Sequence, residues 1–209
     1  MKAIILAAGY AIRLYPLTKN KPKSLLMVGK KPIIEQIIDK LEEIEELDEI
    51  FIITNDKFFW HFEKWLKNFE FTKKIKIIND KTKSNEDRLG AIRDIEFAIN
   101  REKINDNLLV IAGDNLIEFS LIDIMGLSKK KNSTIIALYD VNDNELAKQY
   151  GIVAINKNNK IIHFEEKPKK PKSTLASTGI YLFKRNTLKD IREYIKKGYN
   201  TDKTGFFLE

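Results

Sequence analysis

The sequence contains no cysteine and only two histidines, and both shortages exclude familiar kinds of chemistry. A chain without cysteine forms no disulfide, thiolate zinc site or cysteine nucleophile, which fits a reducing compartment such as the cytoplasm. His61 and His163 have no second ligand at metal-binding spacing, and nothing supports a Ser-His-Asp triad. No apolar run approaches the ~18 residues that cross a membrane, so we expect no membrane partner.

Acidic residues are also missing before Glu35, whereas six basic residues lie between Arg13 and Lys31. This basic connection follows a short apolar run, and it is either a solvated loop or an anion-binding site. The formal net charge of +7 would also suit nucleic acid. However, the lysines are scattered, acidic runs such as 42–46 interrupt them, and no nucleic-acid-binding motif occurs, so we expect no nucleic-acid partner.

Apolar runs of strand length alternate with amphipathic runs of helix length through residues 1–132. The expected strands are Lys2–Ala7, Glu49–Thr54, Lys74–Ile78 and Leu108–Ala112. The expected helices are Pro32–Ile44, Asp56–Phe69 with an aromatic core stripe, Asp87–Asn100 and Asn115–Lys130. This alternation predicts an α/β fold, with a Rossmann-like, mainly parallel sheet and helices on both faces.

The pattern changes after Ser133 to four strand-like runs with little helix between them: Ile135–Tyr139, Gly151–Ile155, Lys160–Phe164 and Leu175–Phe183. Asn158-Asn159 marks a hairpin turn. We therefore expect one domain over 1–209, with a nucleotide-binding half (1–132) and a β-rich sugar-binding half (133–209). The apolar ending at 205–208 resembles the start of a further element, so we expect that the chain is truncated there.

Ligands of open α/β sheets bind beyond the carboxyl ends of the strands, where the basic connection begins. Gly9 lets a ligand approach the backbone, Arg13 offers a planar fork for phosphate, and Lys23 is a compact point charge. Neither a G-x-G-x-x-G fingerprint nor a Walker loop is present, so an anion would depend on side chains as well as on amides.

Three further stretches each have a functional and a structural interpretation. Asp114, after the strand ending at Ala112, is either a Mg²⁺ ligand or a cap of the next helix. Asn85 has the donor and acceptor that reading a base edge requires, with Gly90 allowing a flat ring to approach, but it also suits a helix cap. Glu166 and Lys167 suit either a sugar phosphate or a solvated turn.

These stretches occur in the order of a known family's motifs, L-A-A-G-x-G-T-R-L-x-P-L-T, P-K-x-L-L-x-V and K-P-I-I. The matching positions are 6–9, 13–14, 16–18, 22–23, 25–26, 28 and 31–33, and then 89–90, 113–114, 150–151, 165–168 and 177–179. Over nearly its whole length the chain resembles the sugar-1-phosphate nucleotidylyltransferases, the nucleotide-diphosphate-sugar pyrophosphorylases, and in particular their glucose-1-phosphate thymidylyltransferase-like members.

The resemblance implies a nucleotide-diphospho-sugar transferase fold and a role for each matching residue. The residues implied in catalysis are Arg13 on the β- and γ-phosphates, Lys23 on the α-phosphate, and Asp114 as the Mg²⁺ ligand. The residues implied in binding the base and ribose are Leu6, Ala8, Gly9, Asn85 and Gly90. The residues implied in binding the sugar phosphate are Tyr150, Gly151, Glu166, Lys167 and, in the sugar pocket, Thr178.

The implied reaction joins a nucleoside triphosphate and a sugar 1-phosphate with release of pyrophosphate. Its nucleophile is already an anion, so the protein must chiefly align two polyanions and stabilise the leaving group with cations. Ala11 and Ile12 replace the family's second glycine and threonine, and the sequence ends before the downstream segment in which the family usually has a second metal-binding Asp. A catalytically idle relative that binds nucleotide sugars therefore stays open, as do the base, the sugar and a homo-oligomeric state.

Overall fold

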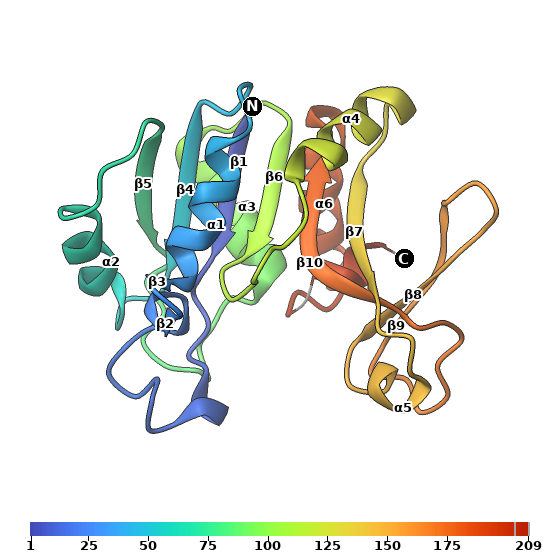
Figure 1. Cartoon of the computed structure of the whole chain (residues 1–209), viewed down its shortest axis with the longest axis horizontal. Coiled ribbons are helices and arrows are strands. Elements are labelled where there is room, and N and C mark those ends of the chain that lie inside the picture. Colours follow the sequence, from blue (N-terminus) through green and yellow to red (C-terminus); the bar gives the residue numbers. More distant parts are fainter. Residues whose placement is uncertain (203, 209) are drawn as a thin grey trace.

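A computed structural model describes residues 1–202 and 204–208, and in this part of the chain eight strands form one continuous sheet (Figure 1). The sheet order is β5-β4-β1-β6-β10-β8-β9, with β7 paired to β10. The strands are β1 (Lys2–Leu6), β4 (Glu49–Thr54), β5 (Lys74–Asn79), β6 (Leu108–Ala112), β7 (Ile135–Asp140), β8 (Gly151–Ile155), β9 (Ile161–Glu166) and β10 (Leu175–Phe183). A separate two-stranded ribbon pairs β2 (Met27–Val28) with β3 (Lys31–Pro32).

The first four strands of this order are parallel, and the strands of the second half join them in antiparallel fashion. β1 pairs with β4 and β6, and β4 pairs with β5, all in parallel register. β10 then runs antiparallel to β6, β7 and β8, and β8 runs antiparallel to β9. The expected β-rich half therefore extends the same sheet instead of building a second one.

Helices cover both faces of the sheet, as the lack of alternation in the strands predicts. The helices are α1 (Ile33–Glu42), α2 (Phe59–Leu66), α3 (Ala91–Glu102), α4 (Leu121–Lys131), α5 (Asn144–Ala147) and α6 (Leu188–Lys196). One apolar cluster joins α1, α2 and α4 to the sheet face that carries Ile5, and the other joins α3 and α6 to the face that carries Ile4. Figure 1 shows α1 in front of the sheet and α3 behind it.

The structure corrects several expected helix boundaries and adds two helices. α3 begins at Ala91 rather than Asp87, because Gly90 before it adopts a φ of 87°. α4 begins at Leu121 rather than Asn115, where the Ser120 side chain accepts a hydrogen bond from the Ile122 amide. The sequence patterns also miss α5 and α6. Within the described residues, none of the helices combines the length and apolar character that a membrane span needs.

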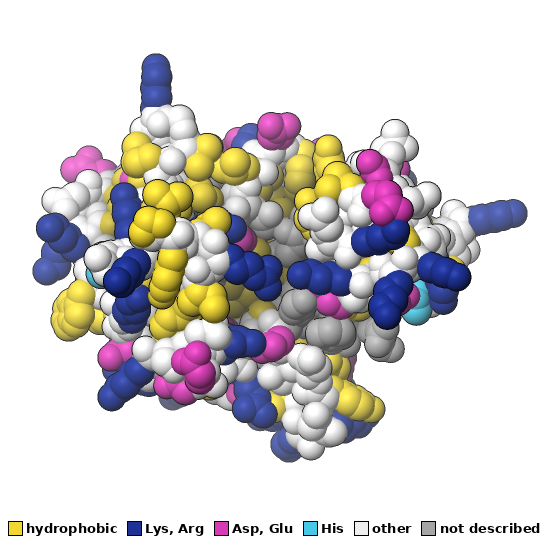
Figure 2. Space-filling model, turned by 90° about the horizontal axis from the view of Figure 1, so that it is seen from below, with side chains coloured by type: hydrophobic (Ala, Val, Ile, Leu, Met, Phe, Trp, Pro, Cys, Tyr) yellow, Lys and Arg dark blue, Asp and Glu magenta, His cyan; other side chains and the backbone are white. Residues whose placement is uncertain are grey.

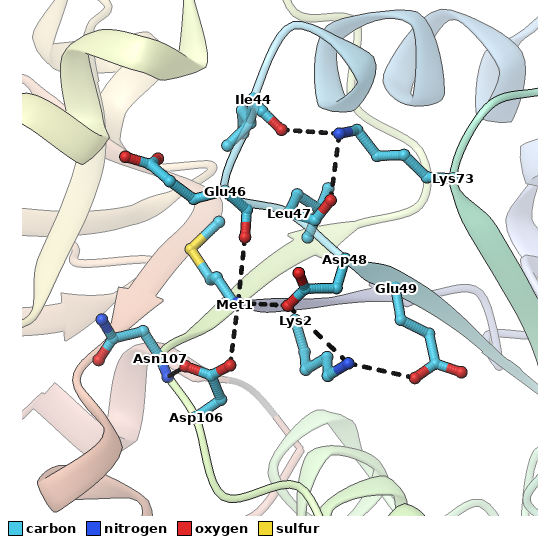
Figure 3. Close-up of polar contacts among 10 residues, drawn as sticks. All are labelled: Met1, Lys2, Ile44, Glu46, Leu47, Asp48, Glu49, Lys73, Asp106 and Asn107. Atoms are coloured by element: carbon cyan, nitrogen blue, oxygen red, sulfur yellow. Dashed lines mark hydrogen bonds and ion pairs between the residues drawn. The ribbon is translucent and has the colours of Figure 1, made fainter.

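The amino terminus is tied to the end of the sheet where β1 begins (Figure 3). The Met1 ammonium donates to the Glu46 carbonyl at 3.0 Å and forms ion pairs with Asp48 at 2.6 Å and Asp106 at 2.9 Å. Burial alone would lower the pKa of this ammonium, but the bonds to the two carboxylates outweigh it and raise the pKa above the ordinary 8.0. These contacts fix the start of β1 at the end of the sheet opposite its carboxyl edge.

Candidate nucleotide and metal site

A cavity of about 530 Å³ lies beyond the carboxyl ends of the parallel strands. Its walls come from the loop that follows β1, the connection from β5 to α3, the first turn of α3, the end of β6 and the segment after α6. Figure 2, viewed from below Figure 1, shows a hollow in this end of the molecule with Lys and Arg side chains on both sides. The basic connection singled out in the sequence therefore borders a cavity.

Buried side chains from β4 and its end hold the start of this connection. The Thr54 hydroxyl donates to the Ala7 carbonyl at 3.2 Å, and the Asn55 amide donates to the Ala8 carbonyl at 2.8 Å. Apart from its chain neighbours, no atom of the described residues lies within 4 Å of where a side chain on Gly9 would begin, so the space beside its backbone is open to a ligand. Sequence reasoning missed Thr54 and Asn55, because only the parallel pairing of β1 with β4 brings them to this loop.

Arg13, Lys23 and Asp114, which are far apart in the sequence, all line this cavity. The Lys23 ammonium forms an ion pair with the Asp114 carboxylate, with 2.7 Å between Nζ and Oδ2. The two side chains are 37% and 47% exposed, so an incoming ligand can reach both. Asp114 does not cap α4, which Ser120 caps instead, and the side-chain amide of the neighbouring Asn115 donates to the Thr178 carbonyl at 2.8 Å.

Gly113, just before Asp114, stands where the end of β6 touches the end of β1. A methyl group there would lie 2.7 Å from the Leu6 carbonyl oxygen and 2.8 Å from the Ser24 hydroxyl. The Gly113 amide donates to that same carbonyl at 2.8 Å. Glycine at this position lets Asp114 leave the strand beside the basic connection.

Asn85, Arg88 and Gly90, from the connection between β5 and α3, form another part of the cavity wall. Neither Ser84 nor Asn85 caps α3, because the helix begins only after Gly90 and no side chain caps it. The backbone amides of Lys83 and Ser84 instead donate to the Asp87 carboxylate within the loop. This leaves the Asn85 amide group available at the cavity, as base recognition requires.

The segment after α6 closes this wall of the cavity. The Ala91 and Ile92 amides donate to the carbonyls of Asp202 and Thr201, at 3.3 and 3.0 Å, and thus satisfy the start of α3. The Arg88 guanidinium forms an ion pair with the Asp202 carboxylate at 3.0 Å. A methyl group on Gly90 would lie 2.7 Å from the Thr201 carbonyl oxygen, so this backbone contact depends on glycine.

The residues expected to bind the sugar phosphate do not line this cavity. Gly151 of β8 is paired with Glu166 of β9, and the Lys167 amide donates to the Tyr150 carbonyl at 2.9 Å. These four residues therefore form one cluster, which lies at the same lower end of the molecule in Figure 1 as the basic connection. Thr178 is separate from them on β10, and its hydroxyl donates to the Ala137 carbonyl at 2.9 Å.

Two buried carboxyl groups that the sequence did not single out lie at the cavity, one in its wall and one next to that residue. Asp94, in the first turn of α3, lines the cavity, and Asp80 follows β5. Burial, and then the neighbouring Asp80, raise the pKa of Asp94 from the ordinary 3.8 to about 8. Burial also raises the pKa of Asp80, although hydrogen bonds from Thr82 act in the opposite direction.

The fold and this cavity are typical of proteins that bind a ligand at the carboxyl edge of an open α/β sheet. Residues 2–206 match the model of the nucleotidyl transferase family, and the chain belongs to that family.

Two individual relatives match more than nine tenths of the chain. The chain is 33% identical to the bifunctional protein GlmU of Methanococcus aeolicus over 94% of its own length, and 32% identical to a putative mannose-1-phosphate guanyltransferase of Sulfolobus acidocaldarius over 91%. It covers 43% and 50% of those proteins, so it spans about half the length of the curated relatives that it matches.

Solved structures confirm the expected fold. A putative glucose-1-phosphate thymidylyltransferase from Bacillus anthracis superposes with a TM-score of 0.82 at 30% identity, covering all of this chain and 82% of that one. A UDP-glucose pyrophosphorylase superposes with a TM-score of 0.76 at 21% identity, covering 92% of this chain and 79% of that one.

Proposed function

We propose that this chain is a sugar-1-phosphate nucleotidylyltransferase, which joins a nucleoside triphosphate and a sugar 1-phosphate into a nucleotide-diphosphate sugar. The observation that carries the proposal is the convergence of Arg13, Lys23 and Asp114 on one cavity that Asn85 and Gly90 also line. Relatives and a structural neighbour whose names describe such transferases support it. A single domain over 1–209 and a cytoplasmic location belong to the same proposal.

In the proposed reaction, a phosphate oxygen of the sugar 1-phosphate attacks the α-phosphorus of the triphosphate. The bond from that phosphorus to the bridging oxygen breaks, pyrophosphate leaves with the electron pair, and no proton has to be removed from the nucleophile. Lys23 would bind the α-phosphate and Arg13 the departing β- and γ-phosphates, so that two fixed cations face the charge that develops. Both side chains line the same cavity, as this division of labour requires.

The residues at Asp114 fit a magnesium ion that arrives with the nucleotide. Mg²⁺ uses one or two protein carboxylates and completes its shell with phosphate oxygens and water. Asp114 presents one half-exposed carboxylate, and no cluster of three or more acidic or histidine side chains suited to a metal occurs in the described residues. When bound there, Mg²⁺ would supply positive charge to the triphosphate oxygens, while Lys23 exchanges its carboxylate partner for phosphate.

The nucleoside would lie between the backbone of 6–9 and the Asn85–Gly90 segment, and the sugar phosphate near the cluster of Tyr150, Gly151, Glu166 and Lys167, with Thr178 at the sugar. The ends of β8 and β9 that carry the cluster lie at the same end of the molecule as the loop after β1, which lines the cavity (Figure 1). A chain that binds nucleotide sugars without turnover is the alternative, and no feature of the site favours it over the enzyme.

The test is to incubate the chain with each nucleoside triphosphate, a panel of hexose 1-phosphates and Mg²⁺, and to measure pyrophosphate. We expect release with at least one pair, and a loss of about 100-fold or more for Arg13→Ala and Lys23→Ala. Lys31→Ala is the matched control, because Lys31 belongs to the same basic connection but is paired with Asp39 at 2.6 Å, outside the cavity. Nucleotide-sugar binding without any pyrophosphate release would instead establish the idle alternative.

A further inference from the structure

The Asp80–Asp94 pair places two acidic side chains next to a cavity that would hold a polyanion, which is unusual. The two side chains are 5% and 6% exposed, and among the described residues neither has a Lys, Arg or His partner within ion-pair distance. Asp80 Oδ1 accepts hydrogen bonds from the Thr82 amide at 2.7 Å and its hydroxyl at 2.9 Å. Asp80 Oδ2 and Asp94 Oδ1 are buried and have no donor among those residues.

A pair of this kind is stable only if it holds a proton, since two neighbouring carboxylates without a cation cannot both be ionised in a buried place. Asp94 is the member whose pKa is about 8, so near neutral pH it is an uncharged acid that donates to Asp80. An uncharged Asp94 does not repel a nucleotide, and its remaining lone pairs can accept hydrogen bonds.

The position of Asp94 points to the nucleoside part of the ligand rather than to its phosphates. Its backbone amide donates to the Gly90 carbonyl at 2.9 Å, which places it one helical turn from the segment assigned to the base and ribose. The Tyr10 hydroxyl, from the loop after β1, lies 3.2 Å from the Thr82 hydroxyl, which donates to Asp80.

We propose that Asp94 is a specificity-determining residue, an inference that rests on the proposed function. Its carboxyl group accepts a hydrogen bond from a donor on the nucleoside. The donor is either the amino group of the base or a ribose hydroxyl. An apolar side chain at this position would leave that donor without a partner in a buried place, which is what makes the contact selective.

Calorimetric titration of the full chain tests this proposal with CTP, UTP and their 2′-deoxy forms, which together vary the base amino group and the ribose hydroxyl. The wild type should bind the form with the donor about 10-fold more tightly than the form without it. Asp94→Asn should keep this preference, because its amide nitrogen can donate to Asp80 while its oxygen accepts from the ligand.

Asp94→Leu should lose about 10-fold in affinity, but only for the nucleotides that carry the donor. Loss restricted to CTP and dCTP would identify the base amino group, and loss restricted to CTP and UTP would identify the ribose. Glu102→Gln is the control, since this carboxylate lies at the other end of α3 in an ion pair with Lys76.

Two results would overturn the inference. One is a wild type that binds all four nucleotides equally, which needs no variant to fold. The other is an Asp94→Leu protein that loses affinity for all four nucleotides to the same degree, which would mark Asp94 as structural. A wild type that binds none of the four would also overturn this inference, whereas only the absence of pyrophosphate release with every nucleoside triphosphate would overturn the proposed function.

Discussion

Replacing the Asp94 carboxyl group by an amide should change how the stability of the fold depends on pH. Asp94 has a pKa of about 8 in the folded chain against an ordinary 3.8, so the folded state keeps a proton that the unfolded state releases. The free energy of unfolding therefore falls as the pH rises from about 4 to about 8. The full gap corresponds to on the order of 5 kcal/mol, which is an upper limit because Asp80 shares the proton.

Asp94→Asn removes this titration and retains a donor toward Asp80, so its advantage over the wild type should be small near pH 4 and grow to several kcal/mol near pH 8. Urea unfolding at half-unit steps between pH 4 and 9 measures the difference. Asp123→Asn is the matched control, because Asp123 also lies in the first turn of a helix, α4, but is exposed. Parallel curves for the wild type and Asp94→Asn would refute the reasoning.

Three further predictions concern the backbone at Gly90, the ion pair of Asp202 and the anchor of the amino terminus. Gly90→Ala should destabilise the fold by about 1–3 kcal/mol in urea unfolding, because Gly90 has a φ of 87° and a methyl group there would lie 2.7 Å from a backbone carbonyl oxygen. Gly126→Ala, within α4 and with open space beside it, should instead stabilise the fold by about 0.5–1 kcal/mol. Equal changes in the free energy of unfolding for Gly90→Ala and Gly126→Ala would contradict this explanation. Asp202→Asn should lower the free energy of unfolding by less than about 1 kcal/mol, since its ion pair with Arg88 is half-exposed. A loss of several kcal/mol would contradict the assignment of this ion pair as a minor contact. Asp48→Asn should lower the thermal midpoint measurably, because it removes a partner of the N-terminal ammonium, and an unchanged midpoint would speak against that anchor.

The sequence predicted those parts of the fold that depend on local pattern. β1, β4 and β6 are runs buried on both faces, and the structure has them close to the expected positions. The starts of α3 and α4 were wrong because polar residues that look like helix caps bind elsewhere: Asp87 holds two loop amides, and Asn115 holds the Thr178 carbonyl. α6 was missed because its apolar positions lie in a run rich in Lys and Arg.

The sequence likewise predicted only part of the candidate site. The rule that ligands lie beyond strand ends placed Arg13, Lys23 and Asp114 together, and their cavity in the structure agrees with that placement. Asp94 and Asp202 could not be found, because no local spacing tells that one faces Asp80 or that the other returns to α3. Contacts of this kind depend on how distant elements pack.

The central claim is that one bound triphosphate is surrounded by Arg13, Lys23 and Asp114. A crystal structure of the chain with a non-hydrolysable nucleoside triphosphate and Mg²⁺ tests it most directly. The account predicts phosphates between the Arg13 and Lys23 side chains, the metal on Asp114, and the nucleoside against Asn85 and Gly90. A nucleotide bound elsewhere, or phosphates that contact neither cation, would contradict it.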